Sequence, residues 1–214
     1  MQSQQLPELN MSENTVTPKE RKPRVSRKSV DVPRDRILRA AALLFRKKGY
    51  KGTTVRDIAE AVGILSGSLF HHFASKEEIL LEIMREAFLS VCIAHEKVLA
   101  TEPDPVKQLR SLIREELEAI LNDERRDYHA VLYFDWREAP EAAMPELNQL
   151  RKRFQGCWLS ALQACADSGR LRCPPDVAEH VINGALRGVM TWFRKGGRYT
   201  TEEFGDAFAH LFIE

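Results

Sequence analysis

Hydroxyl and imidazole side chains gather in one short stretch of the sequence, at Ser66, Ser68, His71 and His72. In the same stretch Leu69 and Phe73 are four residues apart, which places both on one face of a short predicted helix and leaves the polar side chains around the rest of it. The small side chains near the start of this helix let its backbone approach a groove closely. Because hydroxyl and imidazole groups donate and accept hydrogen bonds, the stretch is suited to recognising a partner.

Motifs for bond-breaking chemistry do not occur in the sequence. It contains no Gly-rich phosphate-binding loop, no Gly-x-Ser-x-Gly turn and no His-Glu-x-x-His metal motif. Asp135 and Glu138 lie three residues apart on a predicted helix, where the neighbouring Arg137 and surface exposure explain them without catalysis. We therefore predict that the protein is not an enzyme.

The four cysteines show none of the spacings typical of zinc sites: Cys92, Cys157, Cys165 and Cys173. We expect them to be reduced, mostly buried thiols of a cytoplasmic protein. A redox-sensing role is the less favoured alternative. The sequence predicts no metal site and no cofactor.

The stretch around residues 66–73 lies within a predicted helix-turn-helix. Thr54 with Asp57 resembles a capping box at the start of one helix, and apolar residues then recur at helical spacing up to residue 62. Gly63 is suited to the left-handed conformation that ends a helix. Ser75 with Glu78 caps the start of a third helix. This layout is typical of a DNA reader whose second helix enters the major groove, so the predicted partner is double-stranded DNA. An ordinary helical hairpin without DNA is the alternative.

A further predicted helix, from Arg34 to Lys48, precedes the helix-turn-helix and completes a compact three-helix domain. Its apolar stripe consists of Ile37, Leu38, Ala41, Ala42 and Phe45. The chain as a whole has a net charge of +1, which by itself says nothing about a partner. Residues 1–80, however, carry 15 Lys and Arg against 9 Asp and Glu, whereas residues 81–214 carry 17 against 22. This asymmetry indicates a basic reader joined to an acidic body.

The run from Ile37 to Leu80 resembles the N-terminal domain of the TetR family of transcriptional regulators. The residues that carry the resemblance are Ala41-Ala42, Leu44-Phe45, Gly49-Tyr50, Thr53-Thr54-Val55, Ile58-Ala59, Val62-Gly63, Gly67, Leu69-Phe70, His72-Phe73 and Ser75-Lys76-Glu77. They cover about a fifth of the chain, and the remainder is similar to the family only in length and helical character. The resemblance implies that residues 66–73 form a recognition helix and that the protein acts as a dimer.

Roles in DNA binding follow from this resemblance. It implies phosphate contacts for Thr54, His72 and Lys76. It implies proximity to base edges for Arg56, Ser66, Ser68 and His71, on a DNA-binding surface that also includes Gly67 and Phe70. Packing or solvation is the alternative for the two histidines. Phe70 stands where the family commonly has Tyr, so a phenol hydrogen bond to phosphate is lost. Leu65 stands where Ser or Thr often caps the recognition helix, and Leu has no hydrogen-bond acceptor in its side chain.

Residues 1–33 are predicted to form a disordered basic arm. They contain four prolines, few large apolar residues and no periodicity. A basic tract runs through them into the first helix: Lys19, Arg21, Lys22, Arg24, Arg27, Lys28, Arg34 and Arg36. It fits an arm that follows phosphates or enters a minor groove, with a soluble tail as the alternative. No apolar run suits a signal peptide or a membrane span, so we expect a cytoplasmic protein without a membrane partner.

The fold class predicted for the whole chain is all-α, because helical patterns continue to the end and no period-2 strand pattern occurs. Residues 34–80 form the helix-turn-helix domain, and residues 81–214 form a helical ligand-binding and dimerisation domain. The helices expected after the reader cover 76–99, 103 or 105 to 122, 125–138, a long stretch ending near 167, 175–197 and 200–212.

The last two predicted helices carry a large number of apolar side chains. One stripe consists of Val177, Val181, Ala185, Val189 and Phe193, and the other of Phe204, Ala207, Phe208, Leu211 and Phe212. Much of this surface must be intramolecular core. The family resemblance implies that the rest is the seam of a four-helix dimer bundle. Two half-sites about 34–36 Å apart on DNA would also require a dimer.

Candidates for the wall of a ligand cavity lie in the central helices: Phe88, Cys92, Tyr128, Leu132, Tyr133, Trp136, Phe154 and Trp158. Aromatic residues at such positions are more often core. The family resemblance nevertheless implies a cavity in which a small molecule shifts the spacing of the DNA readers. Asn183 and Arg187 are candidates for the polar or anionic part of that ligand. Residues 64–69 and 192–197 are similar to repressors of lipid and steroid breakdown, which respond to acyl-CoA thioesters.

Together these features predict a homodimeric transcriptional repressor that a small molecule, for example an acyl-CoA, releases from a palindromic operator. A sequence-independent architectural DNA-binding protein is one alternative. Such a protein needs little apolar volume beyond its DNA domain, whereas this chain devotes residues 81–214 to a second domain. A helical enzyme is the weaker alternative.

Overall fold

The computed structural model describes residues 32–121 and 125–214, and the predicted arm lies almost entirely outside these residues. The described residues form nine α-helices and no sheet, which confirms the all-α class. The helices are α1 (Arg34–Lys48), α2 (Val55–Val62), α3 (Ser66–Leu69), α4 (Lys76–Thr101), α5 (Pro105–Leu121), α6 (Arg126–Phe134), α7 (Met144–Asp167), α8 (Pro175–Trp192) and α9 (Thr201–His210). Two 3₁₀ turns, η1 (Trp136–Glu138) and η2 (Glu141–Ala143), connect α6 to α7.

The helix ends of the N-terminal domain follow from local hydrogen bonds, as the sequence predicted. Thr54 Oγ1 accepts from the Asp57 amide at 3.1 Å, and the Asp57 carboxylate accepts from the Thr54 amide at 2.8 Å. These bonds to Thr54 lower the pKa of Asp57 to about 2. Gly63 ends α2 with φ +79°, a value that side chains other than glycine rarely adopt. Ser75 Oγ caps α4 by accepting from the Glu78 amide at 3.2 Å.

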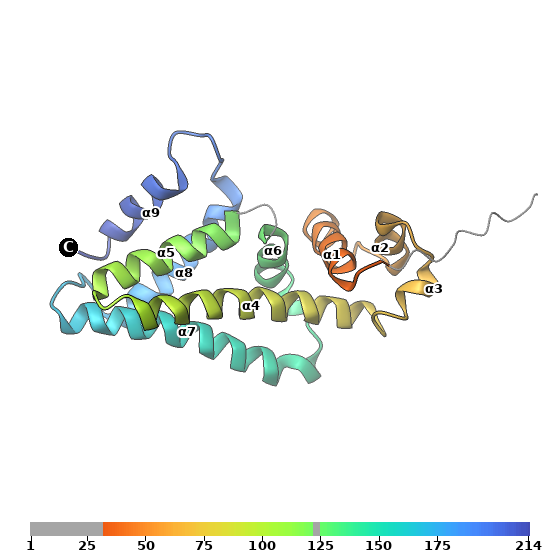
Figure 1. The fold of residues 1–214 in the computed structure, drawn as a ribbon, viewed down its shortest axis with the longest axis horizontal. Coiled ribbons are helices and arrows are strands. Elements are labelled where there is room, and N and C mark those ends of the chain that lie inside the picture. Colours follow the sequence, from red (N-terminus) through yellow and green to blue (C-terminus); the bar gives the residue numbers. More distant parts are fainter. Residues whose placement is uncertain (1–31, 122–124) are drawn as a thin grey trace, which may run out of the picture.

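The long helix α4 joins the two parts of the molecule (Figure 1). The helices α1, α2 and α3 lie at its N-terminal end, and α5 and α7 pack along its C-terminal half, with α8 against α7 and α9 against α5. Between these two groups α6 contacts both α1 and α4. The five apolar residues of the predicted α1 stripe are all buried in this arrangement. A single hydrophobic core therefore runs from the DNA-reading end to the far end of the body.

Four predicted helix ends differ from the structure by two residues or more, and one of them belongs to the helix expected over 76–99, which continues to Thr101. The helix expected over 125–138 ends at Phe134, because Asp135 leaves the helix and its carboxylate accepts from the Tyr50 amide at 3.4 Å. The helix expected to reach the glycine pair at 196–197 ends at Trp192, where Phe193 becomes extended and its buried ring packs 5.5 Å from that of Phe204. The last helix ends at His210, two residues earlier than expected.

The two apolar stripes near the C-terminus divide into a buried part and an exposed part. Val189, Phe193, Phe208 and Phe212 are buried within the chain. Val177 and Val181, in contrast, are 47% and 49% exposed, and Ala185, Ala207 and Leu211 are also exposed. The face of α8 that enters the core is instead Ala178, Ile182, Leu186 and Val189. An apolar strip of α8 and α9 therefore faces away from the core of its own chain.

No helix among the described residues has both the length and the apolar character needed to cross a bilayer. The same residues hold no cluster of three or more histidine, cysteine or acidic side chains able to bind a metal. Three of the four thiols are buried and the fourth, Cys173, is half-buried; all are free. Burial raises the pKa of Cys92 to about 12 and that of Cys165 to about 11, so these thiols are protonated at neutral pH.

Candidate DNA-reading surface and ligand cavity

The predicted DNA-binding residues lie mainly on one end of the molecule, on α2, α3 and the turn after α3. Arg56, Gly67, Phe70 and His71 are exposed, and Ser66, Ser68 and His72 are half-buried. Beneath them Leu69 and Phe73 are fully buried and hold the short helix against the domain core. After Leu69 the chain forms a turn, in which the His72 amide donates to the Leu69 carbonyl at 2.9 Å. The surface thus presents hydroxyl, imidazole and guanidinium groups from helices that are anchored to the domain core.

The helix α3, the predicted recognition helix, lacks a side-chain cap, as expected from Leu65 at its N-terminal boundary. The Leu65 carbonyl accepts from the Ser68 amide at 2.9 Å, which closes the first turn through the backbone. The side chain of Leu65 is 61% exposed and that of Phe70 is 53% exposed. The two departures from the family pattern therefore leave large apolar side chains at both ends of α3.

Lys76 occupies a different environment from the one that a phosphate contact implies. Its ammonium donates to the carbonyls of Tyr50 and Thr53 at 3.0 and 2.9 Å, and lies 4.0 Å from the centre of the Tyr50 ring. The side chain thus holds the 50–53 turn against the start of α4. Binding a phosphate would require the ammonium to leave these carbonyls, so that role of Lys76 stays a prediction.

A cavity of about 460 Å³ lies between α4, α6, η1, α7 and α8. It is lined by Phe88, Leu132, Tyr133, Phe134, Trp136, Arg137, Arg151, Phe154, Gln155, Glu179, Asn183 and Arg187. Of the ten residues predicted for a ligand site, seven line it: Phe88, Leu132, Tyr133, Trp136, Phe154, Asn183 and Arg187. The structure therefore brings residues from five separate elements together around one space, at a size typical of small-molecule sites.

Three predicted residues do not reach this cavity. Cys92 and Trp158 lie one helical turn beyond Phe88 and Phe154 and are fully buried, and the ring of His95 packs against those of Phe154 and Trp158. Tyr128 lines a separate depression on the other side of α6, between α1 and α4. Helical spacing correctly placed the residues along each helix but did not show where the cavity ends.

The wall of the cavity also contains residues that sequence reasoning missed, above all Arg137 and Arg151. With Arg187 they bring three guanidinium groups to the cavity, against the single carboxylate of Glu179. The guanidinium carbon of Arg187 lies 5.2 Å from the centre of the Tyr133 ring. Arg137 was expected on an exposed helix face, and only the fold, which places it in the turn η1, assigns it to the cavity. The excess positive charge favours an anionic ligand group.

Polar groups behind the cavity wall form a buried layer. Tyr133 Oη donates to Glu116 Oε1 at 2.5 Å, and Glu116 is 1% exposed. Burial raises the pKa of Glu116 to about 7 and lowers that of the neighbouring His95 to about 4. His95 Nε2 and Glu116 Oε2 are 3.7 Å apart, but His95 is neutral at physiological pH and the contact is not an ion pair at that pH. The hydrogen bond to Glu116 fixes the ring of Tyr133 against the cavity.

The helix α6 and the turn η1 after it, which form one wall of the cavity, also contact the DNA-reading domain. Three contacts join them: Arg46 with Asp127, the Tyr50 amide with Asp135 at 3.4 Å, and Lys51 with Glu138 at 2.9 Å. Asp135 and Glu138 were expected to be an exposed pair explained by Arg137. That expectation is wrong, because both are half-buried and each contacts the 50–51 turn while Arg137 lines the cavity.

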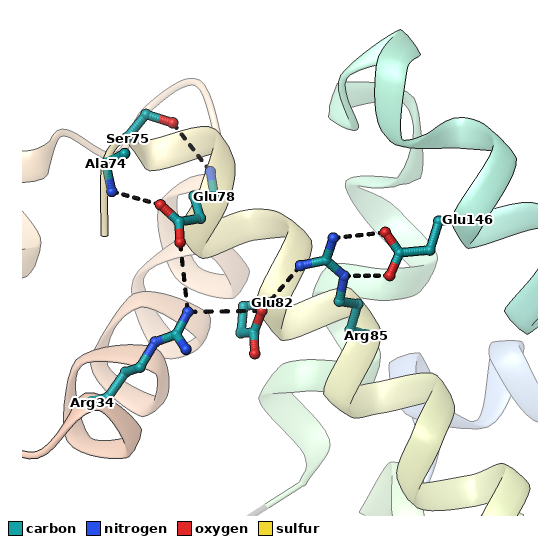
Figure 2. Close-up of polar contacts among 7 residues, drawn as sticks. All are labelled: Arg34, Ala74, Ser75, Glu78, Glu82, Arg85 and Glu146. Atoms are coloured by element: carbon teal, nitrogen blue, oxygen red, sulfur yellow. Dashed lines mark hydrogen bonds and ion pairs between the residues drawn. The ribbon is translucent and has the colours of Figure 1, made fainter. Parts of the chain in front are cut away.

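A second connection runs along α4 (Figure 2). Arg34 of α1 lies 3.6 Å from Glu78 and 3.8 Å from Glu82. One turn further, Arg85 donates to both carboxylate oxygens of Glu146 at the start of α7, at 2.5 and 2.6 Å. Because these side chains are partly exposed, each pair contributes little to stability. The pairs nevertheless link α1 and α7 to the same stretch of α4.

A helix-turn-helix reader joined by one long helix to a helical body with a cavity defines the class of ligand-responsive transcriptional regulators. The chain belongs to the TetR family. Residues 37–83 match the model of bacterial regulatory proteins of the tetR family, and residues 102–214 match a tetracyclin repressor-like C-terminal domain. Family membership sets the chain apart from enzymes and places it among DNA-binding regulators.

Several relatives cover nearly the whole chain. The HTH-type transcriptional repressor KstR2 of Mycolicibacterium smegmatis is 33% identical over 188 residues, which are 84% of this chain and 88% of the relative. The structure of the ketosteroid transcriptional regulator KstR2 of Mycobacterium tuberculosis is 29% identical, with a TM-score of 0.74 over 87% of this chain and 97% of that one. AibR in complex with isovaleryl coenzyme A and operator DNA has the same fold, with 22% identity and a TM-score of 0.77 over 85% and 98% of the two chains.

Proposed function

We propose that the protein is a homodimeric repressor that an acyl-CoA or a related lipid-derived anion releases from a palindromic operator. The observation that carries the proposal is the double role of residues 135–138. Trp136 and Arg137 line the cavity, while Asp135 and Glu138 bind the 50–51 turn of the DNA-reading domain. A ligand that moves this segment therefore moves the reader. Such a ligand shifts the equilibrium only if it binds the DNA-incompetent arrangement more tightly.

The lining of the cavity supports a ligand that is apolar at one end and anionic at the other. Aromatic rings of α4, η1 and α7 supply apolar surface, and three arginines supply positive charge. AibR, which shares the fold, is described as bound to isovaleryl coenzyme A, and the KstR2 relative as a ketosteroid regulator. We propose that the acyl portion of a thioester enters the cavity and that its anionic portion meets the guanidinium groups.

The exposed strip of α8 and α9 supports the dimer. Val177, Val181 and Ala185 repeat every four residues along one side of α8 and are not covered by their own chain. A second copy of the same strip would bury them in a four-helix bundle. Two readers held in this way match the two halves of a palindrome. Since the partner is chromosomal operator DNA, we place the protein in the cytoplasm.

Selection from a random duplex library followed by footprinting tests the function. We expect one short palindromic site and its release by acyl-CoA thioesters added in a series of chain lengths, with free coenzyme A and free fatty acids as controls. Uniform coverage of the DNA would support an architectural protein instead. If the protein binds a palindromic site and no thioester releases it, the effector is not an acyl-CoA.

Arg56→Ala should weaken operator binding about tenfold without changing the melting temperature. Arg56 is exposed on α2, and a contact of a guanidinium with a base edge is worth about 1–3 kcal/mol. Fluorescence polarisation with the selected operator and with a scrambled duplex measures the change. Arg114→Ala on α5 removes the same charge from the body and should leave binding intact. If Arg56→Ala and the natural protein bind the operator with equal affinity, Arg56 does not contact the DNA.

Glu138→Ala should reduce the effect of the ligand on the operator while preserving both binding events. The change breaks the contact with Lys51, one of the three between the cavity segment and the reader. The measured quantity is the operator affinity without ligand divided by the affinity with ligand. Coupling free energies between sites are typically about 1–3 kcal/mol, so the loss of one contact should lower this ratio about threefold. Asp206→Ala breaks the surface pair with Arg110 at the far end and is the control. An unchanged ratio would show that this contact carries no coupling.

A further inference from the structure

Two large apolar side chains are exposed on the DNA-reading surface, at opposite ends of α3. Leu65 is 61% exposed and Phe70 is 53% exposed, whereas Leu69 and Phe73 are at most 1% exposed. The buried pair is sufficient to hold α3 to the domain. The exposed pair therefore contributes nothing to the core that is visible in the structure, and it occupies the surface that faces the major groove in a helix-turn-helix protein.

The composition of this segment restricts how it can read bases. Residues 64–73 contain no Arg, Lys, Asn, Gln, Asp or Glu. The side chains that pair with guanine, with adenine or with the amino group of cytosine are thus missing from α3 and its flanks. Ser, His and apolar side chains remain. Of the four bases only thymine presents an apolar group in the major groove, its 5-methyl group, which apolar side chains recognise by contact.

We infer that Leu65 and Phe70 are specificity-determining residues that each contact a thymine 5-methyl group in the operator. The inference rests on the proposed operator-binding function and adds that α3 and its flanking residues select thymine. Leu65 and Phe70 flank the four-residue helix α3, one at its N-terminal and one at its C-terminal boundary. The two thymines therefore lie at different positions of each half-site. Small neighbours, Ser66, Gly67 and Ser68, allow the backbone to come close enough for both contacts.

Single replacement of thymine by deoxyuridine tests the inference, because deoxyuridine keeps every hydrogen bond of thymine and lacks only the methyl group. The full-length protein first selects its operator from a random duplex library. Each thymine of that operator is then replaced in turn. We expect one or two positions in each half-site at which affinity falls about fourfold, the amount expected from burying one methyl group. The other thymines should show no change.

Two variants assign each methyl group to a side chain. Leu65→Ser and Phe70→Ala should each bind the selected operator about fourfold more weakly and should lose the response to deoxyuridine at one position only. Serine is a favoured residue at the start of a helix and position 70 is exposed, so both variants should keep the melting temperature of the natural protein. Ile93→Ala removes a 60% exposed side chain from α4 and is the matched control, with the full deoxyuridine response.

The outcomes separate this inference from the proposed function. Tight binding of a palindrome that is insensitive to deoxyuridine at every position would overturn the inference and leave the repressor function intact. Deoxyuridine sensitivity that persists unchanged in both variants would also overturn it, since other residues would then contact the methyl groups. Failure to select any specific site would count against the proposed function itself, and the inference would fall with it.

Discussion

Val181→Asp should convert the protein into a monomer and lower its affinity for the operator at least about 100-fold. Val181 is 49% exposed in the single chain and lies in the middle of the apolar strip of α8. In a dimer built on this strip each copy would bury an unpaired carboxylate, which costs several kcal/mol. Separate readers lose the gain of about 10²- to 10⁴-fold that comes from holding two binding sites together.

Sedimentation velocity and fluorescence polarisation on the selected operator measure the two effects. Ile93→Asp places the same charge on an exposed apolar position of α4, outside the strip, and should remain dimeric. Circular dichroism confirms that both variants keep their helices. A Val181→Asp protein that sediments as a dimer would show that α8 does not form the seam.

Arg187→Ala should raise the ligand concentration needed for half-release from the operator about 30-fold and leave DNA binding unchanged. Arg187 lines the cavity and lies against the ring of Tyr133, which Glu116 holds in place. A charge-assisted hydrogen bond from a guanidinium to an anionic group is worth about 2 kcal/mol, which corresponds to this factor.

Titration of the operator complex with the releasing thioester provides the measurement. Arg194→Ala, just after α8 and outside the cavity, is the matched control. Arg187→Lys keeps the charge but loses the planar pair of donors, so it should recover only part of the response. If Arg187→Ala is released at the same thioester concentration as the natural protein, the ligand does not contact this residue.

Sequence reasoning predicted most of the fold because helix ends depend on neighbours in the chain. Thr54 and Thr200 begin their helices through capping boxes, and Gly63 ends α2 through its positive φ. Each of these devices acts over three or four residues, so the sequence displays it directly. The predicted end of a helix was wrong where a residue distant in the chain forms a contact. Asp135, for example, leaves α6, and its carboxylate accepts from the Tyr50 amide.

The lining of the cavity was predicted only in part, for a related reason. Phe88 and Cys92 occupy the same side of α4 one turn apart, and Phe154 and Trp158 do so on α7. The first member of each pair lines the cavity, and the second is fully buried; the ring of Trp158 packs against that of His95. Periodicity assigns a residue to a face of its helix, but the distance between helices decides whether that face meets a ligand or another side chain.

The sequence by itself determined the reader: its three helices, its exposed residues and its departures at Leu65 and Phe70 all follow from bonds and spacings within the segment 34–80. The tertiary structure alone decided which side chains surround the cavity, that Lys76 binds two carbonyls, and that residues 135–138 contact both the cavity and the 50–51 turn. Local hydrogen bonds fix the first set, whereas the second depends on packing between residues up to 85 positions apart in the chain.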